Sequence, residues 1–569
     1  AAECAYWRQK AGIKWLQVGD ANTAYFHSRY RQRRNCNFVA RIKDATGAWL
    51  EDEQDIRRSA VDFVSSLFTS EQNGGQPPTI PFTLPQLSEE DNGMLSALPE
   101  LAELREVVFG LEADSAPGPD GFGAGFYQDC WECIKMDLLE AVKAFFQGMG
   151  LPRSFTSTSI VLLPKIAGAM CWKDFRPISL CNTCSKIISK LVARRLGRVL
   201  PTLVSPWQTG FVPGRGITDN ILLTQELVMD LDRRLRHPNL MLKLDMEKAY
   251  DRIEWPFLLF MLRQFGFQER VVDMFYRLVS NNWFSVLVNG EAAGFFKSTR
   301  GVRQGDPVSP GLFVLVTEFL GRGLHHLLLG RPERFFVSAG SQVPYLAFAD
   351  DMLVFTRCSE ECLGVIKDFL EGYQQASGQK VNANKSAFFL ASGATLGQEQ
   401  MVTRVLGFHR AGFPFTYLGA PIYKGRRLSL LFDGIVAKMR AHLGHWSTKL
   451  LSFGGKLVLA RHVLASLPMY LLQVLNPPKA VLTRLGNICN SFLWDHKGER
   501  RLHWASWEKL CFPTDEGGLG FRSFKDMARA FAAKLWWRFR SGDSIWAEFM
   551  HVKYSAGCHP MEASSARPS

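Results

Sequence analysis

The segment from Tyr345 to Phe355 places two adjacent aspartates, Asp350 and Asp351, between two short apolar runs. Apolar, β-branched and aromatic residues on both sides predict a tight β-hairpin that holds the two carboxylates at its turn. Two carboxylates this close repel each other, so the pair needs either full solvation or a bound cation. Most Asp-Asp turns are solvated, but a solvated turn would not need apolar strands on both sides. A magnesium site at the hairpin is the sharper alternative.

A third aspartate follows a second apolar segment. Leucines alternate with other residues from Asn239 onward, and Asp245 ends the run, which predicts a strand with one buried face. Two magnesium ions about 4 Å apart, held by carboxylates and substrate phosphates, are a common device for in-line displacement at phosphorus. We therefore expect Asp245, Asp350 and Asp351 to be the catalytic residues and the ligands of two Mg²⁺ ions, which Mn²⁺ could replace.

Further motifs accompany these two segments in a fixed order. They are Ala116–Phe122, Leu163–Lys165, Phe175–Leu180, Gly210–Asn220, Arg303–Pro310, Ser377–Asn382 and Tyr417–Pro421. Together with Leu244–Arg252 and the aspartate hairpin, they resemble the reverse transcriptase of LINE-type (non-LTR) retrotransposons, most closely those of plants. The resemblance implies an α+β right-hand polymerase with fingers, a palm with an antiparallel sheet, and a helical thumb. It also implies RNA-directed DNA synthesis, with an RNA template, a DNA primer and dNTPs as partners.

Shifts in composition divide the chain into segments. We expect a basic N-terminal helix and hairpin (1–69), a Gly/Pro-rich linker (70–87), fingers and palm (88–424), a helical thumb (425–510), and a C-terminal helical extension and tail (511–569).

Two cationic residues stand at the ends of predicted strands. Lys165 and Arg176 could clamp a triphosphate, the first as a point charge and the second through its fork of donors, although each alone is more often a surface charge. The family resemblance matches both to the fingertip positions that hold the triphosphate.

Four more residues are candidates for nucleotide binding. Gln304 and Gly305 suit close approach to a base pair, because glycine lets the backbone come near and glutamine offers a donor and an acceptor; the alternative is a structural turn. Tyr250 would ordinarily be core packing, but the resemblance matches it to the residue under the sugar, where a ring excludes a 2′-hydroxyl. Lys385 resembles the mobile lysine that protonates the leaving pyrophosphate. We interpret Asp251, within the same motif as Tyr250, as a structural hydrogen-bond acceptor.

The net charge of +13 and the pI of about 9.2 favour a polyanionic partner, and nucleic acid before a membrane. The candidate nucleic-acid contacts are Arg31, Arg33 and Arg34 in a basic loop, Arg215 in the Gly210–Asn220 motif, and Lys449 and Lys456 on thumb helices. A solvated basic turn is the alternative for the three arginines of the loop. The oligomeric state stays unknown.

Cysteine spacing and hydropathy argue against a zinc site, a membrane span and a signal peptide. Cys130 with Cys133, and Cys181 with Cys184, have ligand spacing within each pair, but the pairs stand too far apart for common zinc sites, so buried thiols are favoured. No apolar run approaches the ~18 residues of a membrane span, and no signal peptide is evident, so we expect an intracellular, nuclear protein. The first residue, Ala1, suggests a fragment of a longer reading frame.

Two other functions compete with a live polymerase. One is a non-catalytic nucleic-acid-binding relic of a retrotransposon, which intact aspartates argue against. The other is a nuclease or cyclase with paired aspartates, which would not require the Arg303–Gly305 loop or the thumb.

Overall fold

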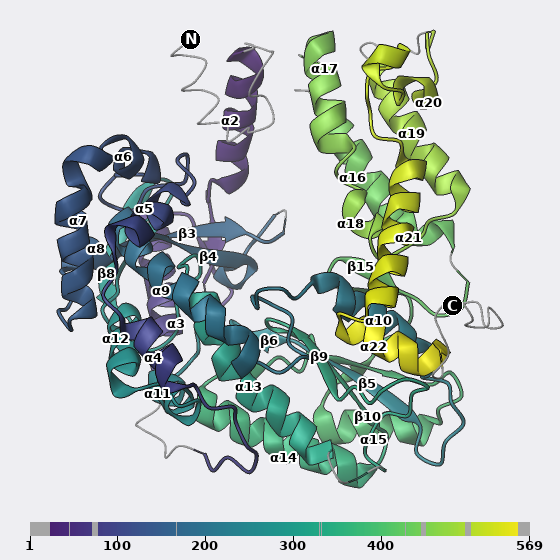
Figure 1. Cartoon of the computed structure of the whole chain (residues 1–569), viewed down its shortest axis with the longest axis horizontal. Helices are drawn as coiled ribbons and strands as arrows, with labels where there is room; N and C mark the ends of the chain where they lie inside the picture. The colour runs from purple at the N-terminus through teal and green to yellow at the C-terminus, as the bar shows by residue number, and fades with distance from the viewer. Residues whose placement is uncertain are drawn as a thin grey trace.

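The computed structural model describes residues 23–44, 46–70, 78–166, 168–328, 331, 333–426, 428–444, 451–494 and 502–555. Figure 1 shows a right-hand arrangement, with the fingers at the left, the palm at the bottom and the thumb helices rising at the right. The fold is α+β, as the sequence predicted.

The palm is built on a sheet with the strand order β13-β12-β5-β10-β9. Its strands are β5 (Asn239–Leu244), β9 (Tyr345–Phe348), β10 (Asp351–Arg357), β12 (Ala387–Leu390) and β13 (His409–Arg410). β5 lies antiparallel to both β10 and β12, and β9 and β10 form an antiparallel hairpin. The predicted hairpin and the predicted strand before Asp245 are therefore both confirmed.

Both faces of this sheet are covered, which corrects the expectation of one buried face for β5. Leu240, Leu242 and Leu244 join a core with the palm and fingers helices, whereas Met241 faces a second core that includes the thumb. The alternation of a strand thus distributes its side chains between two cores. Palm helices on the first side include α11 (Trp255–Gln264), α13 (Ser309–Leu328) and α14 (Glu360–Ser377).

The fingers contain a second sheet, with the order β4-β3-β7-β8. The strands are β3 (Ser157–Pro164), β4 (Phe175–Cys181), β7 (Trp283–Val288) and β8 (Glu291–Lys297). Helix α3 (Glu53–Phe68) packs on it, and the rings of Phe68 and Phe284 stack with centroids 5.1 Å apart. Residues of the expected N-terminal extension thus share a buried core with the fingers strands.

The basic cluster near the N-terminus is helical. Arg31, Arg33 and Arg34 are exposed on helix α2 (Thr23–Asn37), so the predicted basic loop is wrong. The predicted hairpin follows as β1 (Ile42–Lys43) and β2 (Trp49–Leu50), with Gly47 at φ +91° in its turn.

The other helices of fingers and palm surround these sheets. They are α4 (Glu89–Ser96), α5 (Leu101–Phe109), α6 (Ala124–Asp129), α7 (Trp131–Phe146), α8 (Arg153–Thr156), α9 (Thr183–Leu203), α10 (Ile217–Met229), α12 (Glu269–Ser280) and α15 (Leu396–Leu406). Short strand pairs are β6 (Met246–Glu247) with β11 (Lys380–Val381), and β14 (Phe415–Tyr417) with β15 (Ala420–Ile422).

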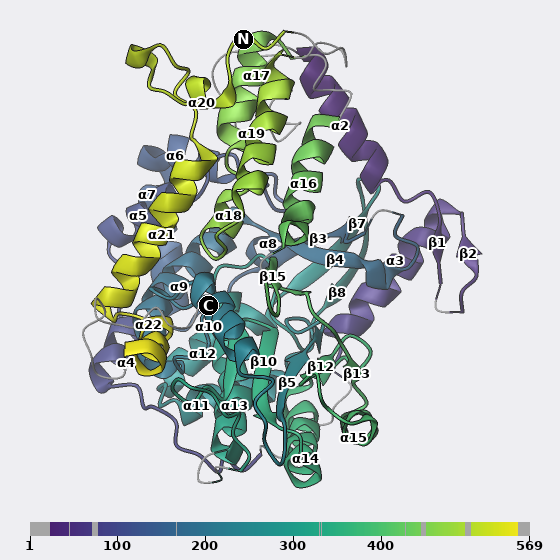
Figure 2. The same ribbon diagram turned by 90° about the vertical axis from the view of Figure 1, so that its right-hand side faces the viewer.

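The thumb and the C-terminal helices stand together, as Figure 2 also shows. They are α16 (Asp433–Gly444), α17 (Phe453–Leu459), the π-helical turn η4 (Ala460–Leu464), α18 (Met469–Leu472), α19 (Lys479–Trp494), α20 (Trp507–Leu510), α21 (Phe524–Ser541) and α22 (Ile545–Met550). Trp507, Phe521 and Phe524 join the same core as the thumb helices. Among the described residues, no helix has the length and apolarity needed to cross a bilayer.

Candidate active site

The three predicted aspartates lie at one end of the palm sheet. Leu244 pairs with Met352 across β5 and β10. Because Asp245 follows Leu244 and Asp351 precedes Met352, the antiparallel register places the two aspartates opposite each other. Asp350 precedes Asp351 in the hairpin turn. The structure therefore brings together all three residues, although more than a hundred positions separate Asp245 from the hairpin.

The electrostatics of the site reflect this crowding. Burial raises the pKa of Asp350 above its ordinary value, and the charges of Asp351 and Asp245 raise it further. Burial likewise raises the pKa of Asp351, with a further contribution from Asp245, while Lys243 opposes the shift. Both side chains remain accessible to solvent, yet enough protein atoms surround them to desolvate the charged forms.

Hard oxygen donors of this kind suit a divalent cation such as Mg²⁺. In the described ranges, no three His, Cys, Asp or Glu side chains are already gathered as a finished ligand set. The three aspartates interact electrostatically. The donor chemistry and the strand register fit a metal site.

The turn that carries Lys385 anchors Asp245. The amide of Asn382 donates to the carbonyl oxygen of Asp245 at 2.8 Å, and the amide of Asp245 donates to the Ser386 hydroxyl at 3.1 Å. Lys385 is exposed on the same turn, which places the predicted proton donor beside the aspartate site.

The two fingertip cations also lie together. Leu163 pairs with Arg176 across β3 and β4, and Lys165 follows two residues later. Burial lowers the pKa of Lys165, and the charges of Lys385 and Arg176 lower it further. Arg176 also counteracts the raised pKa of Asp350. These cations and the aspartates therefore share one electrostatic environment.

Tyr250 and Gln304 are held in defined positions. The Tyr250 ring stacks on Phe313, with centroids 4.4 Å apart and planes at 6°. The side chain amide of Gln304 donates to the buried carboxylate of Asp251 at 3.2 Å, which agrees with the structural role predicted for Asp251. Gly305 is exposed with φ +106°, a conformation that few residues other than glycine adopt.

A buried glutamine that the sequence analysis missed supports the turn that carries Asp350 and Asp351. The Gln208 side chain accepts from the amide of Ala349 at 3.0 Å and donates to the Ala349 carbonyl at 3.2 Å. Ala349 has φ +54°, so this pair of hydrogen bonds holds a strained residue directly before Asp350. The motif that begins at Gly210, two residues after Gln208, was the sequence signal that could have pointed to this glutamine.

Arg215, a predicted nucleic-acid contact, binds backbone carbonyls in this structure. Its guanidinium donates to four backbone carbonyl oxygens. The distances are 3.1 Å to Pro201, 2.8 Å to Val204 and 2.7 Å to Gln208, and the fourth acceptor is Ser205. These donors cap the C-terminal end of α9. The contact of Arg215 with nucleic acid stays a prediction, and the backbone contacts give this arginine a structural role as well.

The thumb candidates have different outcomes. Lys449 lies outside the described residues. Lys456 is half-buried on α17, and its ammonium lies 5.6 Å from the centroid of the Phe492 ring.

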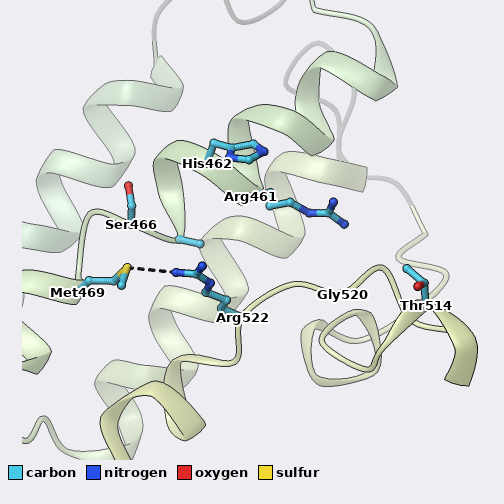
Figure 3. A pocket seen from close by; sticks show the side chains of 8 residues that line it. Arg461, His462, Ser466, Met469, Thr514, Gly520 and Arg522 are labelled. Carbon is cyan, nitrogen blue, oxygen red and sulfur yellow. Dashed lines mark hydrogen bonds between the residues drawn. The ribbon is translucent and has the colours of Figure 1, made fainter. Parts of the chain in front are cut away.

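A pocket of about 430 Å³ lies between η4 and the segment before α21. Figure 3 shows Arg461, His462 and Arg522 among its lining side chains, and no acidic residue lines it among those that the structure describes. The pocket is therefore suited to an anion.

Comparison with known proteins agrees with this geometry. A family model described as reverse transcriptase (RNA-dependent DNA polymerase) matches residues 164–422, which contain all three aspartates. This part of the chain is similar to reverse transcriptases. The match also spans the fingertip cations, the Tyr250 segment and the Arg303–Gly305 loop.

The chain is also similar to proteins of transposable elements. The chain is 27% identical over 571 residues to the transposon TX1 149 kDa protein of Xenopus laevis, covering 93% of this chain and 41% of that protein. It is 29% identical over 276 residues to the Pol polyprotein of the type-2 retrotransposable element R2DM of Drosophila melanogaster, covering 48% and 25%.

A putative ribonuclease H protein of Arabidopsis thaliana is 34% identical over 139 residues, which is 24% of this chain and 22% of that protein. The chain thus spans less than half the length of these relatives. A solved structure of apo telomerase from Candida tropicalis aligns with a TM-score of 0.36 and 15% identity, over 64% of this chain and 62% of that one.

Proposed function

We propose that the chain is an RNA-directed DNA polymerase that transfers nucleotides from dNTPs to a primer 3′-hydroxyl, within a non-LTR retrotransposon of plant origin. The observation that best supports this proposal is the strand register that brings Asp245 opposite the Asp350–Asp351 turn, within the residues that match reverse transcriptase. The Arabidopsis relative supports the plant origin.

Asp245, Asp350 and Asp351 would hold two divalent ions, Mg²⁺ by preference and Mn²⁺ as a substitute. When bound, such ions lower the pKa of the attacking hydroxyl and neutralise charge on the triphosphate. The hardness and charge of the three carboxylates support this assignment.

The surrounding residues position the nucleotide. Lys165 and Arg176 bind the triphosphate, and Lys385 gives a proton to the departing pyrophosphate. Their mutual electrostatic influence supports placing them around one polyanion.

A second group selects the substrate. Tyr250, fixed by its stack on Phe313, excludes a 2′-hydroxyl. Gln304 and Gly305 lie against the templating base pair, and the hydrogen bond from the Gln304 side-chain amide to Asp251 holds that side chain in place.

The RNA template and DNA primer would lie along basic surfaces. We propose Arg31, Arg33 and Arg34 on α2, and Lys456 with the pocket of Arg461, His462 and Arg522, as phosphate contacts. Lys449 remains a candidate on sequence grounds alone.

The test is primer extension on an RNA template with dNTPs and Mg²⁺, comparing the wild type with Asp350→Asn. We expect extension by the wild type, its loss on chelation with EDTA, and its loss in the variant. A folded wild type that binds template-primer without extending it would favour the relic, and equal extension by both proteins would refute the assignment of the site.

A further inference from the structure

Lys248 is a cation of the active site that the motif comparison did not single out. It lies three residues after Asp245, in the turn that follows β6, and is half-buried. Its backbone has φ +50°, which is uncommon for a residue with a Cβ and is usually kept where a particular geometry is needed. The amide of Asp251 donates to the Lys248 carbonyl at 3.0 Å and closes this turn.

The ammonium group of Lys248 is held by two neutral groups. It donates to the carbonyl oxygen of Phe175 at 3.3 Å, at the start of the strand that carries Arg176. It also lies 5.5 Å from the centroid of the Phe63 ring on helix α3, within the range of a cation–π contact. An ammonium has three N–H donors, so these contacts leave a donor for a ligand.

The other cations of the site surround it. Burial, with the charges of Lys165 and Lys385, lowers the pKa of Lys248 to about 8, against the opposing effects of Asp251 and Glu247. Cations from four separate segments therefore repel one another here. A polyanion bound among them would relieve that repulsion.

We propose that Lys248 is a fourth cation that binds the triphosphate of the incoming nucleotide, and that Phe63 of the N-terminal helix α3 is the residue that positions it. The inference rests on the proposed function and deepens it. Residues before the part that matches reverse transcriptases thereby take part in nucleotide affinity, as well as in the core of the fingers.

The experiment measures single-nucleotide addition over a range of dNTP concentrations, which separates the maximal rate from the apparent Kd for the dNTP. We expect Lys248→Ala to raise that Kd at least about 10-fold, because a charge-assisted contact is lost. Phe63→Leu should raise it about 3-fold, because the ring contact is lost while an apolar side chain remains. Phe63→Tyr keeps the ring and should restore near wild-type affinity. Inhibition by inorganic pyrophosphate should weaken in parallel.

The matched control is Phe296→Leu. Phe296 is a half-buried phenylalanine packed against the same fingers core, without a cation over its ring in the described structure. The Phe296→Leu variant should be destabilised as the Phe63→Leu variant is, and its dNTP Kd should be unchanged. Circular dichroism and primer-template binding establish that each variant is folded.

Several outcomes would overturn the inference. One is an active Lys248→Ala variant with an unchanged dNTP Kd. Another is a Lys248→Ala variant in which only the maximal rate falls. An equal rise in the dNTP Kd for Phe63→Leu and Phe296→Leu would show that Phe63 acts only through packing and does not position Lys248. A folded wild type without extension activity would refute the proposed function itself, which is a distinguishable result.

Discussion

Asp251 gives the sharpest quantitative prediction. Its carboxylate is fully buried, one oxygen accepts from Gln304, and the other has no hydrogen-bond partner in the described structure. Burial raises its pKa from 3.8 to about 6, against the opposing charges of Lys248 and Lys165. The folded state therefore binds this proton more tightly than the unfolded state does.

The sign of the effect follows from this linkage. The stabilising contribution of the protonated carboxyl is fully present below the unfolded pKa of 3.8 and is lost as the pH rises through about 6. One pKa unit corresponds to about 1.4 kcal/mol, so the total loss is ~3 kcal/mol, of which about 1.4 kcal/mol falls between about pH 5 and about pH 8. Asp251→Asn cannot titrate and escapes this loss.

The assay is urea unfolding of the wild type and Asp251→Asn at about pH 5 and about pH 8. The free energy of unfolding of the variant, minus that of the wild type, should increase by about 1.4 kcal/mol from the lower to the higher pH. A constant offset from the buried amide cancels in this difference. Asp62→Asn, at an exposed position on α3, controls for the loss of a negative charge. A difference that does not change with pH would refute the reasoning.

Three further substitutions test the geometry around the site. Tyr250→Ala should raise ribonucleotide incorporation relative to deoxynucleotide incorporation by about 10-fold or more, measured by competing dNTP and rNTP addition. Gly210→Ala places a Cβ 2.3 Å from the amide nitrogen of Ala349 and should displace the catalytic turn, lowering the extension rate by about 100-fold, whereas Gly434→Ala, with open space around its Cβ, should leave the rate unchanged. Arg215→Ala should lower the free energy of unfolding by about 3 kcal/mol; a weaker salt dependence of template binding in the same variant would support its predicted contact with phosphate, and an unchanged one would refute that contact.

Local patterns predicted the catalytic strands well. The period of two before Asp245 and the apolar runs around Asp350 are local signals, and each produced the expected strand or hairpin. The pattern could not show that β5 has both faces covered, because the second core comes from thumb residues far along the chain.

Long-range contacts account for the failures. The structural role of Arg215 was missed, because its acceptors are carbonyls at the end of α9 that only the folded chain brings to it. The importance of Gln208 depends on the strained turn at Ala349, which the sequence does not reveal. The basic run from Arg31 to Arg34 has no apolar stripe, so nothing in it signalled a helix.

The most direct test of the central claim is the rate of single-nucleotide addition by Asp245→Asn, Asp350→Asn, Asp351→Asn and Asp251→Asn, at saturating Mg²⁺ and dNTP on an RNA template. Each of the first three should lose at least about 100-fold in rate, because each removes a charge that would hold the catalytic ions. Asp251→Asn should lose much less, because Asp251 acts through Gln304. A near wild-type rate in any of the first three, or an equal loss in all four, would contradict the assignment of Asp245, Asp350 and Asp351 as the catalytic set.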